Sequence, residues 1–202
     1  MKISIICVGK IKEKFYRDAL DEYLKRLSKY AKVNIVEVAD EKTPDGASDK
    51  VCEQIMAKEG EKIKANIPDN AYVISLAIEG KKYTSEGLAN KINSLGISGV
   101  SHIVLIIGGS LGIDKDIKKM SNELISFSDM TFPHQLMRVI LLEQIYRSYR
   151  IINNEPYHKW LIILCFYDII SEKSNEIISN TILKSKIAVL FADYFKEISL
   201  WK

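Results

Sequence analysis

Short apolar runs alternate with segments of helical periodicity, and this alternation constrains the fold more than any other feature of the chain. The strand-like runs lie at residues 3–9, 33–38, 71–76, 102–107 and 124–127. The segments typical of helices lie at residues 12–30, 49–66, 85–95, 114–122 and 133–153. The pattern predicts an α/β domain with a largely parallel sheet, and the almost continuous apolar runs indicate helices on both of its faces. The third strand is expected to end near Leu76, before a turn at Gly80.

Composition sets broad limits on function. The chain has 202 residues, 47% of them hydrophobic, and a formal net charge of +3, which permits an RNA partner without requiring one. Cys7, Cys52 and Cys165 have neither disulfide nor zinc spacing, and Cys7 is expected to be a small buried hydrophobic residue. We expect no metal. The sequence shows no signal peptide and no membrane-spanning run, so a cytoplasmic protein with no membrane partner is expected.

The segment 160–202 differs from the rest of the chain. It contains no Gly, Pro, Arg, His or Gln and is rich in Ile, Leu, Lys and Ser. We therefore expect a domain at residues 1–159, followed by an atypical, helical extension at 160–202.

The first candidate site is the glycine-rich stretch that follows the most apolar strand. Gly108, Gly109 and Gly112 leave room for a ligand to approach the backbone, and ligands bind at the carboxyl ends of strands in α/β sheets. A tight turn without a ligand explains the glycines equally well. The spacing is not that of a dinucleotide-binding fingerprint.

The second candidate site is the stretch SFSDMTFPHQLMRV at residues 126–139. Ser128 or Thr131 could cap the following helix, with Pro133 in its first turn. His134 and Arg138 lie one turn apart, where cationic groups oppose the helix dipole, and this placement is easier to understand if an anion lies nearby. A purely structural histidine is the alternative.

The third candidate site is the cluster Tyr157, His158 and Lys159, after Pro156. Aromatic rings can stack on bases, and cations can contact phosphates. Arg147 and Arg150, on the preceding helix, are further candidates for phosphate contacts. For both groups, a solvated helix end or helix face is the alternative.

These motifs together resemble the RlmH family of the SPOUT superfamily. The resemblance covers residues 1–159 and rests on KISIICVGKIKEKFYRDALDEYLKRLSKY, LAIEGK, IIGGSLG, SFSDMTFPHQLMRVILLEQIYRSYRI and PYHK. It implies a homodimeric, trefoil-knotted α/β enzyme that uses S-adenosyl-L-methionine to methylate N3 of a pseudouridine in the 23S rRNA of the ribosome. The chain departs from the family by continuing past Lys159, and truncation there is expected to leave a folded, active dimer.

The resemblance also implies roles for individual residues. His134, Arg138, Tyr157 and His158 are the candidates for catalysis, and Arg147, Arg150 and Lys159 the candidates for binding RNA. The cofactor would be held by Leu76, Gly108, Gly109, Phe127, Ser128, Asp129, Met130, Thr131 and Phe132. A side chain at position 108 is expected to fill space that the cofactor needs.

Two other functions stay open at this point. One is a small-molecule enzyme that binds a nucleotide through the Gly108–Gly112 loop, although no phosphate-gripping lysine lies at the expected place. The other is a ribosome-binding protein without catalysis, which would need no cofactor pocket.

Overall fold

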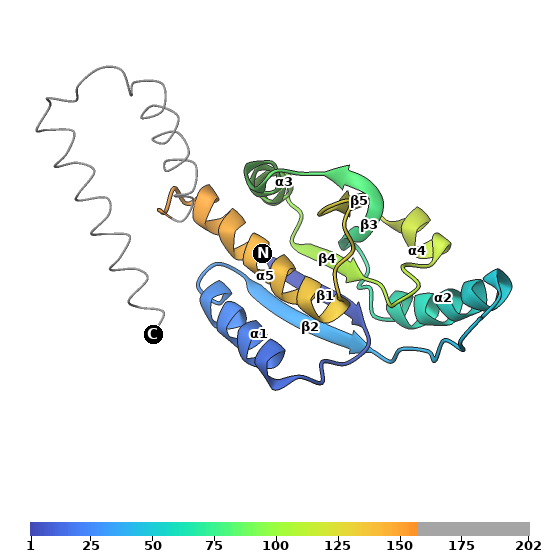
Figure 1. Cartoon of the computed structure of the whole chain (residues 1–202). Helices are drawn as coiled ribbons and strands as arrows, with labels where there is room; N and C mark the ends of the chain where they lie inside the picture. The colour runs from blue at the N-terminus through green and yellow to red at the C-terminus, as the bar shows by residue number, and fades with distance from the viewer. Residues whose placement is uncertain (157–202) are drawn as a thin grey trace, which may run out of the picture. The chain divides into compact units, whose positions relative to one another are not determined.

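A parallel sheet with helices on both faces forms the part of the chain that the computed structural model describes, residues 1–156 (Figure 1). The predicted extension at 160–202 lies outside the described residues. The strands are β1 (Lys2–Val8), β2 (Lys32–Val38), β3 (Tyr72–Lys82), β4 (His102–Ile107) and β5 (Glu123–Ser126). The helices are α1 (Lys14–Leu27), α2 (Asp49–Lys64), α3 (Ser85–Ile97), α4 (Lys115–Met120) and α5 (His134–Ile152).

The sheet has the strand order β2-β1-β4-β3-β5, and every pair is parallel. The predicted α/β class with a parallel sheet is confirmed. Because all strands run the same way, the segments that follow them emerge at one edge of the sheet. In the register of β1 and β4, Cys7 lies opposite Ile107, so the loops that begin at Gly9 and Gly108 leave the sheet side by side. The trefoil knot stays a prediction.

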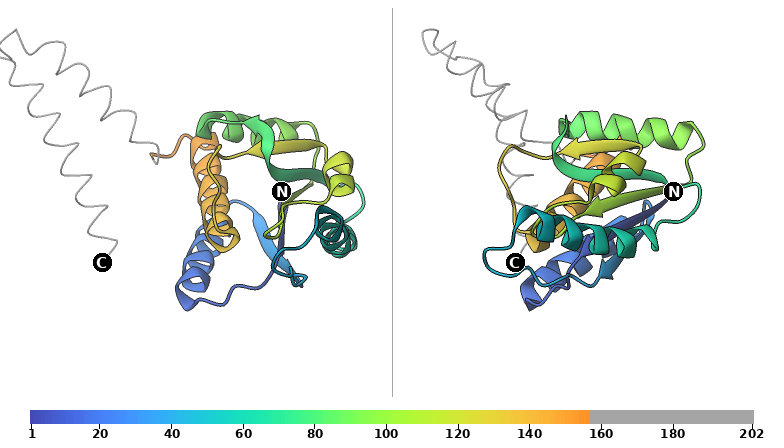
Figure 2. Two further views of the ribbon diagram at one scale, coloured as in Figure 1. Left: turned by 45° about the vertical axis from the view of Figure 1, so that its right-hand side comes forward. Right: turned by 90° about the vertical axis from the view of Figure 1, so that its right-hand side faces the viewer.

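Apolar side chains fill both faces of the sheet. Ile3, Ile5 and Cys7 pack with α1, α3 and α5, whereas the alternate residues Ile6 and Val8 pack with α2 and α4. Successive strand residues point to opposite faces, so an unbroken apolar run is what a doubly covered strand needs. Figure 2 shows α1 and α5 on one side of the sheet and α2 and α4 on the other. The prediction that Cys7 is a buried hydrophobic residue is confirmed.

The predicted end of the third strand was wrong. β3 continues past Leu76 to Lys82, and its pairing with β5 slips, because both Leu76 and Lys81 lie opposite Ile125. A Cβ added at Gly80 would lie 2.6 Å from backbone atoms of Ile125, so glycine is required where the two strands approach. The intervening residues form a bulge rather than a turn that ends the strand.

The expected helix caps were also partly wrong. Pro133 is the N-cap of α5, and neither Ser128 nor Thr131 caps that helix. The Ser128 hydroxyl instead accepts a hydrogen bond from the Met130 N–H at 3.0 Å, which stabilises the loop before α5. Ser48 is the N-cap of α2, but its side chain makes no capping hydrogen bond. Within residues 1–156, no helix is long and apolar enough to cross a membrane.

Candidate functional site

A pocket of about 590 Å³ lies at the edge of the sheet where β3, β4 and β5 end. Three segments form it: the bulged part of β3, the loop after β4, and the segment from β5 into α5. Its volume is typical of small-molecule sites. The lining residues are Leu76, Ala77, Ile78, Ile107, Gly108, Gly109, Ser110, Leu111, Gly112, Ile113, Ile125, Ser126, Phe127, Ser128, Met130, Thr131, Phe132, Pro133, His134 and Met137.

The glycine loop is both a tight turn and a wall of the pocket. The Gly112 N–H donates to the Gly109 carbonyl at 3.1 Å, and Gly112 has a φ of +99°, which glycine adopts without strain. A Cβ at Gly108 would lie 2.3 Å from the Gly112 carbonyl oxygen. The expected reason for glycine at 108 was therefore incomplete, because a side chain would first collide with the loop's own backbone.

The segment between β5 and α5 covers the pocket with small and apolar residues. Phe127, Ser128, Met130, Thr131 and Phe132, which the resemblance assigned to the cofactor, all line it, and their role in binding stays a prediction. The Ser126 hydroxyl donates to the Ser128 carbonyl at 3.1 Å, which fixes the turn out of β5.

The remaining candidate from that segment, Asp129, is not among the lining residues. Its exposed carboxylate pairs with Lys82 at the end of β3. In this arrangement Asp129 links two walls of the pocket from outside.

The bulge of β3 supplies lining residues that the sequence reasoning missed. Ala77 and Ile78 leave the β3–β5 ladder and face the pocket, because the pairing resumes only at Lys81. Gly80 inside an apolar strand was the available signal, since an isolated glycine in a strand often marks a bulge. We had interpreted it as a turn.

His134 and Arg138, one turn apart on α5, occupy different environments. The half-buried His134 lines the pocket, together with Met137. Arg138 is not among the lining residues, and its side chain is fully buried. Its role in catalysis stays a prediction.

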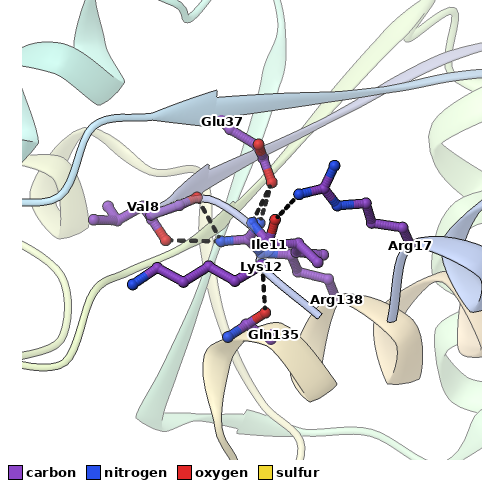
Figure 3. Close-up of polar contacts among 8 residues, drawn as sticks. Val8, Ile11, Lys12, Arg17, Glu37, Gln135 and Arg138 are labelled. Carbon is purple, nitrogen blue, oxygen red and sulfur yellow. Dashed lines mark hydrogen bonds and ion pairs between the residues drawn. The ribbon is translucent and has the colours of Figure 1, made fainter. Parts of the chain in front are cut away.

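The Arg138 guanidinium joins α5 to the ends of two strands (Figure 3). One terminal nitrogen donates to Glu37 of β2 at 2.7 Å, and the other donates to the carbonyls of Val8 and Gly9, each at 2.8 Å. Glu37 also accepts the Ile11 N–H at 3.0 Å. Arg138 therefore fixes the start of the loop after β1.

The arginines predicted to bind RNA make contacts within the domain. Arg147 forms two hydrogen bonds with Glu143, one turn earlier on α5, at 3.0 and 2.6 Å. Arg150 forms an ion pair with Glu155 at 2.8 Å and donates to the Tyr146 hydroxyl. Tyr157, His158 and Lys159 lie outside the described residues, so their predicted roles stay predictions.

The lining of the pocket combines apolar surface with a few hydroxyl groups. Leu76, Ile107 and Ile125 present apolar surface, whereas Ser110 and Thr131 bring hydroxyls. None of the residues that line the pocket is Asp, Glu, Lys or Arg, so polar recognition falls to hydroxyls, backbone groups and His134. Residues 1–156 contain no group of three or more His, Cys, Asp or Glu side chains placed to hold a metal ion.

A family model described as "Predicted SPOUT methyltransferase" matches residues 1–158. The chain belongs to this SPOUT methyltransferase family. Relatives within the curated proteins carry a more specific name. "Ribosomal RNA large subunit methyltransferase H" of Bifidobacterium adolescentis is 67% identical over 159 residues, which are 79% of this chain and 100% of that protein. The protein of the same name from Clostridium novyi is 60% identical over the same shares.

A third relative, "Putative ribosomal RNA large subunit methyltransferase H" of Methanococcus maripaludis, is 61% identical over 159 residues, again 79% of this chain and all of that protein. The resemblance inferred from the sequence motifs is confirmed. The α/β sheet and the pocket described above are thus those of a SPOUT methyltransferase.

Proposed function

We propose that this chain methylates ribosomal RNA of the large subunit, with S-adenosyl-L-methionine as methyl donor and N3 of a pseudouridine in 23S rRNA as acceptor. Membership of the SPOUT methyltransferase family and the names of relatives that are 60–67% identical support the reaction class. The observation that carries the proposal is the pocket, in which most of the residues that the sequence assigned to the cofactor lie together.

The lining fits the proposed cofactor. Leu76 and Ile125 would contact the faces of the adenine, and the backbone of the Gly108–Gly112 loop would bind its polar edge. The hydroxyls of Ser128 and Thr131 are available to the ribose and the amino-acid tail. When bound, S-adenosylmethionine supplies a methyl group on a positively charged sulfur, from which it leaves readily.

The chain's own residues must then align the acceptor nitrogen with the methyl carbon and accept the proton of that nitrogen. Positioning alone contributes about 7–11 kcal/mol to such reactions. His134 lines the pocket at the first turn of α5, and an imidazole is a suitable proton acceptor near neutral pH. We assign to His134 the acceptance of the N3 proton. We expect Tyr157 and His158 to position the base.

The proposed catalytic unit is residues 1–159, acting as a homodimer in the cytoplasm. The family model ends at residue 158 and the relatives align over 159 residues, which supports this boundary. A chain truncated after Lys159 should bind the cofactor and transfer methyl groups at least as well as the full chain. Loss of folding on truncation would show that 160–202 is an integral part of the enzyme.

Methyl transfer from radiolabelled S-adenosylmethionine to ribosomes that lack the modification tests the proposal, with free 23S rRNA as a second substrate. Nuclease digestion and mass spectrometry should find the label on N3 of one pseudouridine. Calorimetric titration with S-adenosylmethionine separates the alternatives. Binding without transfer would favour another acceptor, and no binding would favour a ribosome-binding protein without catalysis.

A further inference from the structure

We propose that the loop from Gly9 to Glu13 binds the phosphate backbone of the RNA beside the target nucleotide, through Lys10 and Lys12. The proposal rests on the proposed function, because it names residues that hold the substrate of the same site. It assigns the RNA contact to a part of the chain other than Arg147 and Arg150, the candidates named from the sequence.

The loop lies beside the pocket. It begins where β1 ends, next to the end of β4, and a Cβ added at Gly109 would lie 3.1 Å from a methyl carbon of Val8. At its other end, the Lys12 N–H donates to the Gln135 side-chain oxygen at 3.3 Å. Gln135 follows His134, which lines the pocket. Both ends of the loop therefore lie next to residues that form the pocket or adjoin it.

The packing of the loop forces its two lysines outward. Ile11 is 4% exposed and belongs to the core, whereas Lys10 and Lys12 on either side of it are exposed. Among the described residues, the ammonium groups of Lys10 and Lys12 have no hydrogen-bond or ion-pair partner. Figure 3 shows the Lys12 side chain extending away from the surrounding polar contacts.

Three other cations near the pocket or on α5 already form ion pairs. Lys82 pairs with Asp129, and Lys118 pairs with Glu79 at 2.6 Å. Arg147 is engaged by Glu143 on the same helix. Lys10 and Lys12 can therefore neutralise phosphates without first breaking an ion pair.

The backbone of the loop is held in place by several contacts. Arg138 binds the Gly9 carbonyl, Glu37 accepts the Ile11 N–H, and Arg17 donates to the Ile11 carbonyl at 2.7 Å. A segment that is fixed before binding loses less conformational entropy when it meets a ligand.

Two of the carboxylates near the loop are paired, Glu37 with Arg138 and Glu41 with Lys62. Asp40 lies near the start of the loop, and Glu13 at its end has one buried carboxylate oxygen without a hydrogen-bond partner. Glu13 is half-buried whereas Lys10 and Lys12 are exposed, so the lysines are the charges that the loop presents to solvent. A polyanion such as RNA fits this surface. Lysine contacts to phosphate fix the position of a nucleic acid without reading its sequence.

Steady-state kinetics with the full chain and ribosomes as substrate test the proposal. The double variant Lys10→Ala/Lys12→Ala should raise the KM for ribosomes on the order of tenfold and leave kcat unchanged. The slope of log KM against log salt should fall by about 1.4, which corresponds to two lost phosphate contacts. The Kd for S-adenosylmethionine should not change. Lys10→Arg/Lys12→Arg should retain the wild-type KM.

Lys25→Ala/Lys64→Ala is the matched control, since it removes two exposed lysines at helix ends on the opposite edge of the sheet. An equal rise in KM in this control, or an unchanged KM and salt slope in the loop variant, overturns the proposal. If the wild-type chain transfers no methyl group, the proposed function fails separately. The loop is then tested by the salt dependence of binding to a labelled 23S rRNA fragment, where an unchanged slope in the loop variant overturns it.

Discussion

Replacing Arg138 by methionine tests whether its buried contacts stabilise the domain. The guanidinium is fully buried and makes one charged hydrogen bond, at 2.7 Å, and two hydrogen bonds to carbonyls, at 2.8 Å. Methionine is apolar and smaller, so it leaves the Glu37 carboxylate and two carbonyls without this donor. Removing one partner of a buried ion pair costs about 3–5 kcal/mol.

The low end of that range applies here, because a third of the Glu37 side chain is exposed and water can replace part of the lost contact. We expect a loss of about 3 kcal/mol, or a fall in Tm of about 6–12 °C for a domain of this size. Arg138→Lys keeps the charge and should lose about half as much. Urea unfolding followed by circular dichroism measures both variants.

Glu37→Gln is the matched partner variant, because its amide oxygen can still accept the Ile11 N–H. The double-mutant cycle with Arg138→Met should give a coupling free energy of about 1–2 kcal/mol. A loss below about 1 kcal/mol in Arg138→Met would refute the reasoning, since the buried contacts would then contribute little beyond their desolvation cost.

The same variant separates two roles of Arg138. If Arg138 positions the loop after β1, Arg138→Met assayed well below its Tm should raise the KM for ribosomes and leave kcat nearly unchanged. If it contacts the reacting atoms, as the sequence predicted, kcat should fall by two orders of magnitude or more.

Three further predictions concern the core, the hydrogen bonds of Glu123 in β5, and the pocket. Burial raises the pKa of the Cys7 thiol to about 12, so iodoacetamide at pH 8 should modify the half-buried Cys52 in the native protein and Cys7 only after unfolding, as read by peptide mass spectrometry. Burial would raise the pKa of Glu123, but hydrogen bonds from Lys91 and two tyrosines have the larger effect and lower the pKa below 4.5. The loss of stability in Glu123→Gln should therefore be constant above pH 4.5 and become smaller as the pH falls below it. A loss that stays constant down to about pH 2 would contradict this. Gly108→Ala should weaken S-adenosylmethionine binding at least tenfold in calorimetry, whereas the control Gly46→Ala, at an open position with positive φ, should cost about 1 kcal/mol of stability and leave affinity unchanged.

Local patterns were sufficient to predict most of the elements. Strands β1, β2, β4 and β5 and all the helices of residues 1–156 begin and end within three residues of the expected positions, because periodicity and capping residues act over a few neighbours. The glycines after β4 and the segment before α5, which the family resemblance assigned to the cofactor, line one pocket. Each is a contiguous motif, so it can be recognised in the sequence, while its role in binding the cofactor stays a prediction.

Contacts between distant segments could not be predicted in the same way. The bulge of β3 depends on the approach of Gly80 to Ile125, and the strand order depends on which apolar runs meet in space. Ala77 and Ile78 were missed because Gly80 fits both a turn and a bulge, and the sequence was interpreted as a turn. A single apolar sequence fits a straight strand and a bulged one equally well, so only the partner strand decides between them.

Arg138 shows that the anion expected from a local argument can come from the chain itself. A cation in the early turns of a helix opposes the dipole, so the sequence suggested an anion nearby, and a ligand was the obvious choice. In the structure this anion is Glu37, which lies 101 residues upstream. A guanidinium nitrogen of Arg138 donates to its carboxylate at 2.7 Å. Because Arg138 is paired with Glu37, an external anion is better bound by cations that have no partner in the described domain. Lys10 and Lys12 meet that condition, and Arg138 holds the loop that presents them.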